Sequence, residues 1–205
     1  MKLKSNLCVL AVLPLVLSIS ACSGSGGGNT PKPETSSQAH STSTVQTTLD
    51  PCQVVTAEEA SALAGVTFGP GIEEDTSADG QYGRRCTYGA RTANVFFVQV
   101  GQAASAESAK SQWEEEQAEV NANISDSLGS DISSHLVKQD LTGIADLAAA
   151  TTFSFPTEDV TINGTSLAAL KGKTFLAFGD LLKDAPAPTI ELMQAQAVVS
   201  LARLP

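Results

Sequence analysis

The cysteines are the residues of this chain whose chemistry can be assigned most readily from their positions. A thiol can be acylated, oxidised to a disulfide or bound to a metal ion, and its sequence context decides among these. The chain of 205 residues contains four: Cys8, Cys22, Cys52 and Cys86. Cys22 directly follows an apolar segment, whereas the last two lie within a sequence of globular composition.

The N-terminus has the pattern of a signal peptide. Two lysines, Lys2 and Lys4, precede an apolar run from Leu7 to Ile19, which is shorter than the roughly 20 residues that span a bilayer. The sequence Ile19-Ser20-Ala21-Cys22 resembles the bacterial lipobox, in which an aliphatic and two small residues precede the cysteine that receives diacylglycerol. We therefore expect residues 1–21 to be a lipoprotein signal peptide and Cys22 to be lipidated. An ordinary signal peptide with a chance cysteine is the alternative.

A lipidated Cys22 would hold the protein on the extracytoplasmic face of the cell membrane. Each buried CH2 contributes about 0.8 kcal/mol, and two or more acyl chains anchor a protein stably where one does not. Residues 22–49 are rich in Gly, Ser, Thr and Pro, so we expect a disordered tether, which would also contain His40. A flexible coil of this length spans roughly 30 Å. The folded domain is expected at 50–205.

Cys52 and Cys86 remain once Cys8 has been removed with the signal peptide (the leader, residues 1–21) and Cys22 carries lipid. In a chain expected to cross the membrane, a disulfide between them is the economical inference. It would close a loop of 34 residues, worth about 3–4 kcal/mol in the chain-entropy model. A pair of metal ligands is the alternative, although no histidine or second cysteine pair accompanies them.

The charge and the motifs exclude several classes of function. The net charge is −10, and the leader carries two lysines and no acid, so its removal changes the charge to −12. Such acidity argues against binding to nucleic acid and against electrostatic binding to anionic lipid. His135 has no Asp or Ser at a telling spacing, and G-x-S-x-G and H-E-x-x-H motifs are absent. We therefore expect a protein that is not an enzyme, with no catalytic residue, metal or cofactor.

The order of the predicted strands and helices indicates a single domain with an α+β fold, in which about three helices pack on an antiparallel sheet of about five to seven strands. Thr56 and Glu59 form a capping-box motif for a helix that ends at Gly65. Asn163-Gly164 predicts a hairpin turn. A polar loop is expected at 69–83. The other predicted helices are 105–120 and 189–204, and the predicted strands are 66–68, 84–88, 95–100, 148–155, 160–162, 165–170 and 174–178.

Trp113 lies on an apolar stripe of the predicted helix 105–120, so we expect it to seat that helix on the sheet. Stacking against a ligand is the alternative. The C-terminal helix has one apolar face, formed by Ile190, Met193, Ala197, Val198, Leu201 and Leu204.

Three segments are similar to the actinobacterial lipoproteins with domain of unknown function 3558. They are Asp50-Pro51-Cys52-Gln53-Val54-Val55-Thr56, Arg85-Cys86-Thr87-Tyr88 and Gly143-Ile144-Ala145-Asp146-Leu147-Ala148. The segment Leu167-Ala168-Ala169-Leu170-Lys171-Gly172-Lys173 and a C-terminal helix that ends in Arg-Leu are also typical of that family. Tyr88 stands where the family commonly has Trp, and Ala145 where it commonly has Gly. The resemblance implies a lipid anchor and a Cys52–Cys86 bridge, and it carries over no catalytic residue.

These features together predict a membrane-anchored, non-enzymatic binding or accessory module of the bacterial envelope. Its expected partners are the lipid bilayer, through Cys22, and an envelope protein or a lipid ligand. The alternative is a carrier that holds an apolar ligand such as a lipid between sheet and helices, which requires a large apolar cavity.

Overall fold

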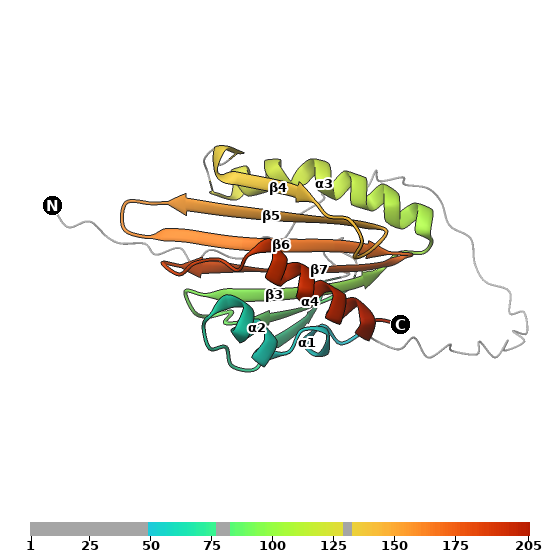
Figure 1. The fold of residues 1–205 in the computed structure, drawn as a ribbon, viewed down its shortest axis with the longest axis horizontal. Coiled ribbons are helices and arrows are strands. Elements are labelled where there is room, and N and C mark those ends of the chain that lie inside the picture. The colour runs from blue at the N-terminus through green and yellow to red at the C-terminus, as the bar shows by residue number, and fades with distance from the viewer. Residues whose placement is uncertain (1–48, 77–82, 129–132) are drawn as a thin grey trace, which may run out of the picture.

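The fold of this chain is a single antiparallel sheet with helices on both faces (Figure 1). The computed structural model describes residues 49–76, 83–128 and 133–205, so the leader, Cys22 and nearly all of the tether lie outside the described residues. The predicted α+β class is confirmed. The strands are β1 (Ile72–Asp75), β2 (Arg84–Tyr88), β3 (Val95–Gln102), β4 (Leu136–Asp140), β5 (Leu147–Pro156), β6 (Thr161–Lys171) and β7 (Thr174–Lys183), in the order β1-β2-β3-β7-β6-β5-β4.

Four helices cover the sheet unequally. The helices are α1 (Pro51–Val54), α2 (Ala57–Ala64), α3 (Ala106–Leu128) and α4 (Ile190–Arg203). The first two and α4 pack on one face, and α4 crosses in front of the central strands in Figure 1. The other face receives α3, which continues to Leu128, beyond its predicted end at residue 120. No described helix is long and apolar enough to cross a membrane.

The two faces follow from the alternation of side chains along each strand. Leu176 and Phe178 of β7 are fully buried in the main core beneath α4. Phe175, the residue before Leu176, faces the other way and meets Trp113 of α3 edge-on, with ring centroids 6.0 Å apart. Trp113 is 7% exposed. It therefore seats α3 on the sheet as the sequence predicts.

Local sequence signals account for the starts of α2 and α4. The Thr56 hydroxyl accepts the Glu59 N–H at 3.3 Å, and the Glu59 carboxylate accepts the Thr56 N–H at 2.9 Å, which completes the predicted capping box. Gly65 follows α2 in the left-handed conformation at φ 65°. Thr189 caps α4 by accepting the N–H of Leu192.

Several details of the prediction are wrong. The segment 66–68 is not a strand, because Phe68 instead turns into the aromatic core beside Tyr88. The segment 69–83 is not all loop, since its residues 72–75 form β1. Val198 is 53% exposed and faces away from the core, although the rest of the predicted apolar face of α4 is buried or partly buried.

Asn163-Gly164 is not a turn. Both residues lie inside β6, a continuous strand of 11 residues. The chain reverses earlier, where Thr157 N–H donates to the carbonyl of Val160 at 2.7 Å. Glycine is needed at 164 for a different reason, because a Cβ there would lie 2.5 Å from the ring of Phe153. Asn-Gly here marks a close approach between neighbours on the sheet.

Candidate functional site

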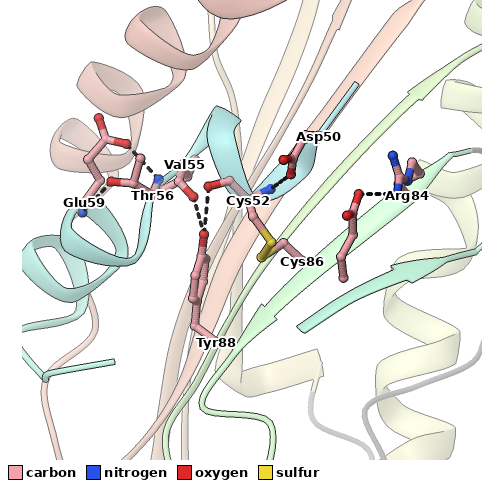
Figure 2. The surroundings of a disulfide bond; sticks show 9 residues. Asp50, Cys52, Val55, Thr56, Glu59, Arg84, Cys86 and Tyr88 are labelled. Carbon is pink, nitrogen blue, oxygen red and sulfur yellow. Dashed lines mark hydrogen bonds and ion pairs between the residues drawn. A yellow bond between two sulfur atoms is a disulfide. The ribbon is translucent and has the colours of Figure 1, made fainter. Parts of the chain in front are cut away.

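Cys52 and Cys86 form a disulfide that joins α1 to β2, the pair indicated by the cysteine count. Their sulfur atoms are 2.06 Å apart and their Cα atoms 5.2 Å apart. Figure 2 shows Asp50 beside this bridge, where its carboxylate accepts the N–H of Cys52 at 2.9 Å. Gly71 lies against the bridge, and a Cβ there would collide with the Cys86 sulfur. This close packing makes the bridge a structural element of the core.

Tyr88 fixes the end of α1 from beneath. Its hydroxyl donates to the carbonyl oxygen of Val55 at 2.6 Å and also lies 3.2 Å from that of Cys52 (Figure 2). Burial raises the pKa of Tyr88 to about 12, so the phenol remains a donor at neutral pH. Because both acceptors are backbone groups, Tyr88 has a positioning role in the fold.

Glu59 and Arg203 tie the first helices to the last one. Two guanidinium nitrogens of Arg203 donate to the two carboxylate oxygens of Glu59 at 2.6 and 2.7 Å. Arg203 also donates to the carbonyl of Val54 at 2.9 Å. The hydrogen bonds from Arg203 lower the pKa of Glu59 to about 2. Arg203 thus bonds both to Glu59 and to the backbone of α1, and this Glu59–Arg203 clamp serves the fold.

A groove beside the N-terminal end of α4 is the candidate binding site. It has a volume of about 790 Å³ and is open to solvent. The segment 184–188 forms one wall, and the strands β4, β5 and β6 form the floor. Most of its floor side chains carry a hydroxyl or an amide, and they include Thr152, Ser154, Thr161, Asn163 and Thr165.

The wall of the groove is fastened to β6 by hydrogen bonds. The Asn163 amide donates to the carbonyl of Ala185 at 2.8 Å, and the Thr165 hydroxyl donates to that of Pro188 at 2.8 Å. The carboxylate of Asp184 accepts the N–H of Thr161 at 2.8 Å. Two prolines within 184–188 restrict its backbone further. The groove is therefore largely preformed.

A buried carboxylate lies under this wall. Asp180 of β7 is 2% exposed, and its Oδ1 accepts the N–H of Thr165 at 3.0 Å. Its Oδ2 is buried and has no hydrogen-bond partner among the described residues. Burial raises the pKa of Asp180 to about 7, against the opposing effect of the Thr165 N–H. Asp180 is thus a titratable group that bonds to Thr165, the residue that holds Pro188 of the groove wall.

The single histidine of the described residues lies at the end of the groove. His135 meets Phe155 edge-on at 5.7 Å between ring centroids, and it borders the groove near Val137. No described group of three or more His, Cys, Asp or Glu side chains could hold a metal ion. The groove therefore offers hydrogen-bonding groups and a hydrophobic rim for binding.

The space beneath α3 is much smaller. Beside Trp113, the gap between α3 and the sheet has a volume of about 20 Å³, whereas pockets for small ligands occupy roughly 300–1,000 Å³. Glu116 borders this gap, and burial raises its pKa to about 7. No stacked ligand fits against Trp113 here.

Sequence reasoning missed the groove, although the strands contain a signal for it. The α4-facing positions of β5 change from Ala148 and Ala150 to Thr152 and Ser154 along one face. A strand face that changes from apolar to polar halfway indicates that the core ends there. The equivalent change in β6 was obscured because Asn163-Gly164 has the pattern of a turn.

Comparison of the chain with family models, with curated proteins and with solved structures finds no match.

Proposed function

We propose that this protein is a non-enzymatic binding module anchored in the bacterial envelope, with the groove beside α4 as its binding surface. The observation that carries the proposal is the groove itself, which is open, about 790 Å³ in volume and floored by hydroxyl and amide side chains. Such groups recognise a ligand through hydrogen bonds without reacting with it. The proposed anchor is Cys22, through the lipobox resemblance of Ile19-Ser20-Ala21-Cys22.

The openness of the groove favours a partner with an extended shape. A segment of a protein could lie along β5 and β6 and reach Ser154 and Asn163 with its backbone groups, while its side chains contact Val137 and the proline-containing wall. The net charge of −10 disfavours an acidic partner. We therefore infer that the ligand is an exposed, extended segment of a neutral or basic envelope protein.

The alternative, a carrier of apolar ligands, has less support. A lipid chain needs an enclosed apolar space, whereas the gap beside Trp113 measures about 20 Å³ and the groove is open to solvent. The similarity to lipoproteins with domain of unknown function 3558 remains part of the proposal. It is supported by the Asp50-Pro51-Cys52 segment and by the spacing of Cys52 and Cys86.

Photo-crosslinking in the native envelope tests the proposed binding surface. A diazirine-bearing amino acid at exposed Ser154 should form a discrete adduct that mass spectrometry can identify. The matched control places the same amino acid at Lys110, an exposed position of α3 on the opposite face of the sheet. Identical adducts from both positions, or none from Ser154, would argue against the groove as the binding surface.

A further inference from the structure

The two edges of the sheet differ in how strongly they oppose pairing with another strand. At one edge, β1 exposes Glu73, Glu74 and Asp75 in succession, and a row of like charges opposes the approach of a second copy. At the other edge, β4 is also exposed at four of its five positions, and its Val137 is 62% exposed. No described strand pairs with the outer side of β4.

The hydrogen-bonding pattern shows which backbone groups of β4 face outward. The N–H of Leu141 donates to the carbonyl of Ala148 on β5 at 2.8 Å. Hydrogen-bonded positions alternate along an antiparallel pair, so Val137 and Gln139 also bond to β5. The N–H and C=O groups of the even-numbered residues, including Lys138 and Asp140, therefore point away from β5. Any strand added at this edge must pair with these residues.

We propose that β4 is a self-association edge, at which two copies pair antiparallel with Gln139 opposite Gln139 and Lys138 of each copy opposite Asp140 of the other. The alternation of outward groups permits registers that differ by two residues. Centring on Lys138 would place lysine opposite lysine, and centring on Asp140 would place aspartate opposite aspartate. Only the register centred on Gln139 forms two pairs of opposite charge.

Charge also explains why this register matters for the whole molecule. Each chain has a net charge of −10, so two copies repel one another overall, and a register that placed like charges opposite each other at the contact would add to this repulsion. The pairing is short, and we expect a reversible dimer whose population rises with concentration. Confinement of anchored copies to a membrane would raise their effective concentration.

The dimer would place both grooves on one side. Neighbouring antiparallel strands are related by a two-fold axis perpendicular to the sheet, so the α4 faces of both copies point the same way. Val137 borders the groove and lies on β4 itself. The two grooves would therefore flank the new strand pair, and a long partner could contact both.

Charge substitutions test the pairing in the full chain, purified in detergent and measured by sedimentation velocity over a concentration series. Lys138→Asp places aspartate opposite Asp140, and Asp140→Lys places lysine opposite Lys138, so each variant alone should lose at least tenfold in dimer affinity. An equimolar mixture of the two should form a heterodimer, because each mixed pair then has opposite charges. Lys110→Asp, with the same charge change on α3, is the matched control and should dimerise like the wild type.

Recovery in the mixture also shows that both variants are folded. Disulfide formation reports the register, since Gln139→Cys should link to itself across the two-fold axis and Lys138→Cys should not, with peptide mapping to identify the linked residues. A wild type that stays monomeric over the series, a dimer that neither charge variant weakens, or linkage through Lys138→Cys would each overturn the proposal.

Discussion

Asp180 is the buried carboxylate whose ionisation should dominate one part of the pH dependence of stability. Its pKa is raised to about 7 in the folded protein, against a model value of 3.8. The folded state therefore keeps this proton to a higher pH than the unfolded state does. The stabilising contribution is fully present below about pH 4 and is lost as the pH rises to about 7. That interval corresponds to a loss on the order of 4 kcal/mol in the free energy of unfolding.

Asp180→Asn keeps an acceptor for the N–H of Thr165 and removes the ionisation. Its amide would bury two N–H donors without a described partner, whereas the protonated carboxyl of the wild type buries one O–H donor, and one further unpaired donor costs about 1–3 kcal/mol. We therefore expect the variant to be less stable than the wild type by roughly that amount at pH 4. At pH 8 it should be more stable than the wild type by about 1–3 kcal/mol, because the wild type then buries a charge.

Urea unfolding of the full chain from pH 4 to pH 8 measures this difference between the two proteins. Comparison with Asp180→Asn separates Asp180 from other groups that titrate in this range, such as Glu116. Asp184→Asn is the matched control, because Asp184 accepts a backbone N–H from Thr161 but is exposed. The reasoning is refuted if Asp180→Asn destabilises the protein equally at pH 4 and pH 8, since the carboxylate would then be as well stabilised when charged.

Three further predictions concern the anchor, the bridge and the clamp. Cys22→Ser should release the protein from membranes or leave an uncleaved precursor; unchanged fractionation and acyl labelling would contradict the anchor. Mass spectrometry under non-reducing conditions should detect no free thiol at Cys52 or Cys86, and replacing both by Ser should cost about 3–4 kcal/mol in urea unfolding; an unchanged midpoint would contradict this. Glu59→Gln should cost about 1–2 kcal/mol at pH 7, a value discounted for the partial exposure of Arg203. Because the pKa of Glu59 is lowered to about 2, this cost should shrink as the pH falls from about 5 toward 2, and a constant cost would contradict the assigned ion pair.

The sequence predicts best those elements whose local signals agree with their packing. The capping box at Thr56 and Glu59 forms as expected, because its hydrogen bonds are made within one turn of helix. The apolar positions of β3 and the stripe containing Trp113 also face their cores. In these elements, periodicity and burial carry the same information.

The failures occur where contacts distant in sequence decide the structure. The strand β1 has no apolar alternation and is formed by pairing with β2, where Glu73 reaches Arg84 at 2.8 Å. Asn163-Gly164 satisfies a turn pattern, yet Phe153 and the chain near Ala185 hold it within β6. Neither contact has a signature in the local sequence.

The groove depends both on a local sequence pattern and on contacts between residues distant in sequence. Its floor is visible in the sequence as a change from Ala to Thr and Ser along one face of β5. Its wall depends on hydrogen bonds from Asn163 and Thr165 to a segment more than 20 residues further along the chain. Sequence alone therefore marks where the core ends, and the fold is needed to show that a groove begins there.

Filling the groove while recording adducts from it tests the proposed function most directly. The photo-reactive amino acid at Ser154, an exposed residue that borders the groove and lies on β5 rather than on the edge strand β4, should capture an envelope partner in an otherwise wild-type chain. Adding Thr152→Trp, which occupies the floor, should abolish that adduct, whereas adding Lys110→Trp on α3 should leave it unchanged. Folding of both variants is checked by their urea midpoints. An adduct that persists at full yield in the folded Thr152→Trp chain would contradict the assignment of the groove as the binding surface.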